Sequence, residues 1–182
     1  MSLALRLLDG HVPPVARRAA LRALFATTAA GFGCPVPPLD GLDADGLLRR
    51  YARFTRDQAE AALRDGRDLP ALHDRLERGA RALGARLRAG LRLRTTEDAT
   101  TAARMVYGLL DIDLRGNGCG DITVRRCPFS EVYSAEVCRL VGALDAGLLV
   151  SLSGADRLEF TQRITEGAPC CLARLHPRRR AG

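Results

Sequence analysis

The 182-residue sequence contains no tryptophan and no lysine, and aromatic residues make up only 4% of it. All 28 basic side chains are therefore arginines, and the net charge is +7. A basic balance by itself favours anionic partners. Single-stranded nucleic acids, however, are usually held by stacking aromatic side chains, which are scarce here. We therefore expect no nucleic acid among the partners.

Long apolar runs are also missing. A membrane-spanning helix needs roughly 20 apolar residues, and the longest candidate, around residues 148–152, is far shorter. Charge interrupts the apolar stretch at the N-terminus, and no small-residue cleavage site follows, so no signal peptide is expected. These features predict a cytoplasmic protein with no membrane partner.

The remaining composition is that of an ordinary globular domain, with 47% hydrophobic and 27% charged residues. Six cysteines are present: Cys34, Cys119, Cys127, Cys138, Cys170 and Cys171. In a reducing compartment, cysteines are buried, catalytic or metal-bound more often than they are cross-linked. Their placement is therefore the first indication of chemistry.

Helical periodicity dominates residues 1–110. Apolar side chains recur every three or four residues, and capping residues precede several of these stretches. We expect four helices, from Pro14 to about Ala30, from near Asp43 to Ala62, from Leu69 to Gly90 and from Thr95 to about Leu110. A loop with three prolines and two glycines, over residues 31–38, separates the first two helices.

The pattern changes at Asp111, where apolar and polar residues begin to alternate. A hairpin is expected around the glycine-rich turn of residues 116–120, followed by a helix capped by Ser130. Strands follow at 157–165 and 170–175. The sequence thus predicts an α+β fold in which a helical N-terminal half precedes a small antiparallel sheet (β-β-α-β-β) with helices packed on one face. Residues 111–176 would form one continuous globular unit with residues 1–110, and residues 177–182 would form a basic tail.

Four cysteines lie in the last third of the chain: Cys127, Cys138, Cys170 and Cys171. The last strand is expected to lie under the preceding helix, which would let these thiols converge. Neighbouring residues on a strand point to opposite faces. Because Cys171 shares its parity with Ala173 and Leu175, it is the cysteine of the last pair expected to face the helix.

Three interpretations of this cluster compete. Free cysteines often serve as small buried hydrophobic residues. A metal or iron–sulfur site is the second interpretation, but the close cysteine pairs or added histidines typical of such sites are missing, so we expect no cofactor and no metal. The third is a thiolate nucleophile. Cys127 precedes the predicted helix start, where the helix dipole lowers a thiol pKa, whereas Cys138 would lie about three turns along that helix.

Carboxylates are better placed than histidines to assist such a thiol. Asp145 follows Cys138 by seven residues, which is two helical turns on the same side, in an apolar setting. It is either a satisfied core acid or one tuned for proton transfer. Arg163 on the penultimate strand could bind a substrate carboxylate or lie on the sheet surface. The histidines are far from the cysteines in sequence, at His11, His73 and His176.

Two sequence stretches resemble the L-2-amino-thiazoline-4-carboxylic acid hydrolase family. The first places Cys127-Pro128-Phe129 before Cys138 and the Ala-Leu-Asp sequence that ends at Asp145, and the second spans residues 160–171. The resemblance covers roughly residues 105–175. Similar cysteine patterns occur in vinyl-reductase-type ligand-binding domains and in iron–sulfur-sensing regulators. The chain departs from the family pattern at Pro169 and Leu172, where aspartates are expected around the last cysteine.

The resemblance implies a hydrolase that acts on a C–N or C–S bond of a small heterocyclic or amide-like substrate, in a biosynthetic pathway. Cys138 or Cys171 would be the nucleophile, with Cys127 at a third marked position and Asp145 relaying protons. Arg163 and Thr161 would bind the substrate, and turn amides near Gly167 would stabilise the developing anion. The partner would be a small molecule, and a homodimer fits these expectations. The alternative is a non-catalytic module that senses a small ligand, a metal or an iron–sulfur cluster through the same cysteines.

Overall fold

The computed structural model describes residues 12–177 and has the predicted α+β architecture. The N-terminal segment expected to carry no signal peptide, His11, and residues 178–182 of the predicted tail lie outside the described residues. The N-terminal helices are α2 (Pro14–Phe32), α3 (Ala44–Arg64), α4 (Leu69–Gly90) and α5 (Thr96–Gly108). These helices match the predicted ranges closely because side-chain caps set three of their starts, at Asp43, Asp68 and Thr95.

The sheet contains four antiparallel strands in the order β1-β2-β4-β3. Its strands are β1 (Asp113–Gly116), β2 (Asp121–Arg126), β3 (Arg157–Gln162) and β4 (Cys171–His176). The predicted strand 157–165 ends earlier, because residues 164–166 form the short 3-10 helix η2 (Ile164–Glu166). The last strand extends to His176, one residue further than expected, because the His176 carbonyl accepts a hydrogen bond from the Asp156 amide.

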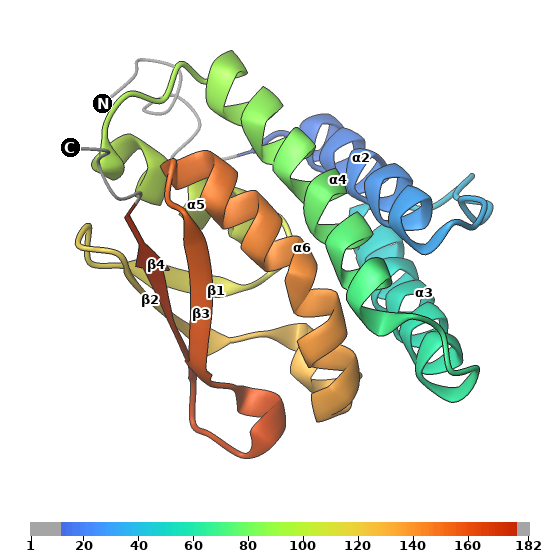
Figure 1. Ribbon diagram of the computed structural model, residues 1–182. Coiled ribbons are helices and arrows are strands. Elements are labelled where there is room, and N and C mark those ends of the chain that lie inside the picture. The colour runs from blue at the N-terminus through green and yellow to red at the C-terminus, as the bar shows by residue number, and fades with distance from the viewer. Residues whose placement is uncertain (1–11, 178–182) are drawn as a thin grey trace.

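The elements form layers, with the sheet at one side of the molecule (Figure 1). Helices α5 and α6 (Ala135–Ser153) cover one face of the sheet, and its other face carries polar side chains such as Arg157, Glu159 and Arg174. Helix α4 packs along α6 on the side away from the sheet, α2 packs against α4, and α3 contacts both α2 and α6. Helix α6 therefore lies between the sheet and helix α4. The positions of the cysteines depend on the elements packed against α6 and on the residue at which α6 begins.

The start of α6 differs from the prediction. Ser130 does not cap this helix, because its hydroxyl donates to the Cys127 carbonyl at 2.6 Å inside the 3-10 helix η1 (Pro128–Glu131). Ser134 is the cap instead, and its side chain accepts the amide of Val137. Cys138 consequently lies in the first turn of α6, and the expectation that it would lie about three turns along a helix was wrong.

Helices α4 and α6 approach each other unusually closely because glycines lie at their crossing. A Cβ atom on Gly84 would lie 2.8 Å from the Leu148 carbonyl oxygen. A Cβ atom on Gly147 would collide with the Glu77 carbonyl oxygen and would lie 2.9 Å from the Ala80 side chain. No larger side chain fits at Gly147 without separating the helices.

No helix among residues 12–177 combines the length and apolar character that a bilayer span requires.

Candidate functional site

A cavity of about 100 Å³ lies at the N-terminal half of α6. Its walls come from all five helices α2 to α6, from the chain around η1 and η2, and from the first residue of β4. Three of the six cysteines line it, namely Cys127, Cys138 and Cys171, together with Asp145. The structure thus brings together four residues that are distant in sequence and that the sequence singled out as candidate catalytic groups.

Cys138 has the most electropositive surroundings of the three thiols. The Arg163 guanidinium donates a hydrogen bond to the Cys138 sulfur, with Nη1 and Sγ 3.7 Å apart. Arg163 itself stacks over the Phe160 ring, with 3.8 Å from the guanidinium carbon to the ring centre. The first-turn position of Cys138 adds the positive end of the α6 dipole. The guanidinium and the helix start thus lie on the same side of the cavity as this sulfur.

The other two thiols are held in their neutral form. Burial raises the pKa of Cys127 to about 12, although backbone amides of Phe129 and Ser130 act in the opposite direction. The expectation that a helix start would lower the Cys127 pKa was wrong, because η1 is a single short turn and burial outweighs its amides. Burial also raises the pKa of Cys171, whose sulfur accepts the Ile164 amide at 3.4 Å. Cys171 does point toward the helix-covered face, as its parity predicted.

Asp145 pairs with a buried tyrosine. The Tyr107 hydroxyl donates to Asp145 Oδ1 at 2.7 Å, and Tyr107 is only 3% exposed. Burial raises the pKa of Asp145 above its ordinary value, while the Tyr107 hydrogen bond and the charge of Arg163 act in the opposite direction. The seven-residue spacing from Cys138 does place both side chains on the same side of α6, facing the cavity.

The sequence reasoning missed the tyrosines of this site. All three tyrosines of the chain line the cavity, at Tyr51, Tyr107 and Tyr133. Tyr51 and Tyr107 lie within predicted helices, but the sequence analysis assigned no tyrosine a functional role. The signal for Tyr107 was present in its spacing of four residues from Ala103, which is also buried. Phe129 completes the aromatic wall, stacked on Tyr133 with ring centres 5.4 Å apart.

The remaining predicted residues lie outside the cavity lining. Thr161 is exposed, and its hydroxyl donates to the Leu172 carbonyl at 3.3 Å. Gly167 is exposed at the end of η2. His73 lies beside Glu77 on α4, and His176 pairs with Glu159 on the polar face of the sheet. Cys170 accepts a hydrogen bond from the Gln162 amide group.

Across residues 12–177, the structure contains no group of three or more cysteine, histidine or acidic side chains arranged to hold a metal ion. The three cavity cysteines share the space with aromatic and aliphatic side chains instead.

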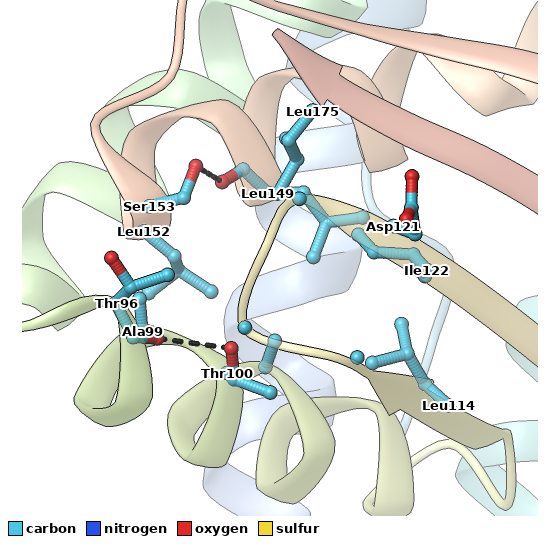
Figure 2. A pocket seen from close by; sticks show the side chains of 14 residues that line it. Thr96, Ala99, Thr100, Leu114, Asp121, Ile122, Leu149, Leu152, Ser153 and Leu175 are labelled. Carbon is cyan, nitrogen blue, oxygen red and sulfur yellow. Dashed lines mark hydrogen bonds between the residues drawn. The ribbon is translucent and has the colours of Figure 1, made fainter. Parts of the chain in front are cut away.

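A second, smaller hollow lies at the other end of α6, beneath the glycine-rich turn between β1 and β2. It has a volume of about 30 Å³, and Figure 2 shows Leu114, Ile122 and Leu152 among the side chains around it. Its hydroxyls are used within their own helices: Ser153 donates to the Leu149 carbonyl at 2.7 Å and Thr100 to the Thr96 carbonyl at 2.9 Å (Figure 2). This hollow is a packing gap at the end of the core.

No family model, no curated protein and no solved structure matches this chain. The resemblance to thiazoline-carboxylate hydrolases therefore stays a prediction from the sequence motifs.

Proposed function

We propose that the protein is a cysteine-dependent hydrolase of a small heterocyclic or amide-like substrate, with Cys138 as the nucleophile and Asp145 as the proton-transfer group. The observation that carries this proposal is the contact of Cys138, on the cavity wall, with Arg163 beside the cavity, near the Tyr107–Asp145 pair that also lines it. A thiol in contact with a guanidinium, and a carboxyl whose pKa is raised by burial, are the two groups that acyl transfer to sulfur would use.

The size of the cavity limits the substrate. An engineered apolar cavity of about 150 Å³ holds one benzene molecule. The cavity here, at about 100 Å³, matches a single five-membered ring or a group of similar size. A substrate with a carboxylate would place it toward Arg163, which makes no ion pair with any side chain among residues 12–177 and lies beside the cavity at Cys138.

The reaction follows from the two groups. The Cys138 thiolate adds to the electrophilic carbon of the C–N unit, and the C–N bond breaks as Asp145 donates its proton to the leaving nitrogen. Water then adds to the thioester carbon and gives one proton to Asp145. Breaking the C–S bond releases the acid and restores the thiolate. The net change is hydrolysis of one C–N bond by one water molecule.

Separate replacement of the three cavity cysteines tests the nucleophile. We expect C138S to lower the turnover of 2-amino-thiazoline-4-carboxylate, or of a related ring substrate, by at least about 100-fold. C127S and C171S are the matched controls and should retain most activity, because their thiols are held neutral by burial. Full turnover by C138S would rule out this mechanism.

A non-catalytic small-ligand-binding module is the second candidate, because two of the three cavity thiols have raised pKa values and most of the lining is apolar or aromatic. This candidate predicts ring binding without turnover and slow alkylation of Cys138 by iodoacetamide. The hydrolase predicts that iodoacetamide modifies Cys138 before the other two, which mass spectrometry of the modified peptides would measure.

A further inference from the structure

An open groove of about 690 Å³ lies where helices α4 and α6 end, in the upper left of Figure 1. It shares no lining residue with the cysteine-containing cavity. Its volume is within the roughly 300–1,000 Å³ of small-molecule sites. Four arginines line it, namely Arg81, Arg88, Arg92 and Arg94, and no acidic or aromatic side chain among residues 12–177 does so. The charged side chains of this groove are therefore all of one sign.

Two of these arginines are held in place by the protein. Arg81 forms an ion pair with Glu77 one turn earlier on α4, with Nη2 and Oε1 2.5 Å apart. The Arg88 guanidinium donates to the Leu152 carbonyl at 2.7 Å, near the end of α6. A Cβ atom on Gly154 would lie 3.1 Å from Arg88 Nη1, so the glycine leaves room for this crossing. Arg88 is thus fixed across the end of α6.

Arg92 occupies a position that usually carries glycine. Its amide donates to the Ala89 carbonyl at 3.1 Å, and the Leu93 amide donates to the Arg88 carbonyl at 3.0 Å. These two bonds form a Schellman motif, whose left-handed residue is glycine in most proteins. Arg92 adopts this conformation with a φ of 53°, although it is less favourable for a residue with a Cβ atom. The stability of the fold therefore does not account for an arginine here.

The positive charge of the groove exceeds what the protein neutralises. Arg92 and Arg94 are exposed, and neither forms an ion pair with a side chain in the described part of the chain. Glu77 neutralises one of the four arginine charges. The C-terminal ends of α4 and α6 each carry a partial negative charge of roughly one half, so together they offset about one more. About two positive charges are left for a ligand.

We propose that this groove binds a phosphate monoester, a site separate from the proposed hydrolase cavity and independent of that function. A phosphate monoester carries about 1.5 to 2 negative charges at pH 7, which matches the charge left in the groove. The planar guanidinium group of arginine also fits two phosphate oxygens at once. The lining offers no aromatic ring for a base to stack on, so the organic part of the ligand is a polyol or sugar.

NMR titration of the 15N-labelled full chain with glycerol 3-phosphate tests this inference. The amide signals of Leu93, Ser151 and Gly154 should shift in the wild-type protein. R92G and R94Q should each weaken binding by about 10-fold or more, because each removes a charged hydrogen-bond donor. R86Q is the matched control: Arg86 is exposed on α4 outside the groove, so this variant loses the same charge and should bind within about twofold of the wild-type protein.

The ligand's charge is tested separately. Dimethyl phosphate, with one negative charge, should bind more weakly than glycerol 3-phosphate, and glycerol should not bind. Equal binding of the two phosphates, or equal weakening by R86Q and R94Q, would show a general attraction of anions and would overturn the inference.

The melting temperature separates binding from folding at Arg92. R92G places glycine at the left-handed position of the Schellman motif, so it should melt at the wild-type temperature or higher while binding glycerol 3-phosphate more weakly. A lower melting temperature would assign Arg92 to the stability of the fold and would overturn its role in binding.

Further probes distinguish the source of the ester. Vesicles of phosphatidylcholine with and without phosphatidate carry the same monoester on a membrane. Binding of glycerol 3-phosphate but not of the vesicles would support a soluble metabolite, and binding of the phosphatidate vesicles alone would support a lipid headgroup with the same ester. Tighter binding of a short DNA duplex than of either, weakened equally by R86Q, would overturn the inference in favour of a polyanion surface.

Discussion

The two ends of helix α6 border two hollows of opposite character. The hollow at its C-terminal end is small and surrounded by leucine and isoleucine side chains, and its hydroxyls bond to carbonyls of their own helices. The cavity at its N-terminal end is about three times larger and is lined by three thiols and the Asp145 carboxyl. The same helix thus packs the core with one end and presents chemical groups with the other.

Under the proposed function, this difference separates residues that serve stability from residues that would serve a ligand. Polar groups that support a fold are paired within the protein, because an unpaired buried group is destabilising. Polar groups that serve a ligand are left partly unpaired until it binds. Substitutions at the C-terminal end of α6 should therefore change the free energy of unfolding, and substitutions at the cavity should change binding and turnover.

Leu152→Ala gives the largest expected stability effect. Leu152 is 1% exposed at the smaller hollow, and truncating such a leucine costs about 2–5 kcal/mol of unfolding free energy. Urea denaturation would measure it, with Leu172→Ala as the control because Leu172 is 37% exposed. Turnover per folded molecule should not change. A loss of activity in folded Leu152→Ala protein would contradict the separation of the two ends.

Gly147→Ala should also destabilise the protein, by about 1–3 kcal/mol, because a methyl group there collides with the Glu77 carbonyl of α4. Gly90→Ala is the matched control. Gly90 is likewise helical, but no atom lies within 4 Å of the position that an added methyl group would take, so alanine should be neutral or stabilising by up to about 1 kcal/mol. Thermal denaturation of both variants would compare them. Equal changes in melting temperature for the two variants would show that the α4–α6 crossing has room for a methyl group at Gly147.

Tyr107→Phe has the smallest expected effect on stability, about 1 kcal/mol for one lost hydrogen bond. The same substitution should also change how turnover depends on pH. Asp145 must be protonated to act as an acid, so turnover should fall as the pH rises through its pKa. The Tyr107 hydrogen bond lowers that pKa, so its removal should move this limb to higher pH. Tyr133→Phe, whose hydroxyl pairs with Thr55, is the control and should leave the limb in place.

Much of the fold could be predicted because the deciding interactions are local. Asp43, Asp68 and Thr95 each accept an amide at the start of their own helix, so the helix starts follow from a few neighbouring residues. The start of α6 could not be predicted in the same way. Ser130 and Ser134 are both suitable caps, and the choice depends on the bond from Ser130 to the Cys127 carbonyl.

The site was predictable only in part, because some of its contacts are local in sequence and others depend on tertiary packing. The seven-residue interval between Cys138 and Asp145 fixes their common side on any helix, so their shared orientation toward the cavity followed from the sequence. The contact of Arg163 with Cys138, and the meeting of Tyr107 with Asp145 across two helices, depend on tertiary packing. No local spacing encodes either contact.

The glycine crossing of α4 and α6 has a consequence for how this protein could change its ligand. Ala80 contacts Gly147 at the crossing and also forms part of the cavity wall. A bulkier residue at Gly84 or Gly147 would push α4 outward and enlarge the chamber without any new group inside it. Under the proposed function, the size of the ligand would therefore be set in part by residues that never contact it.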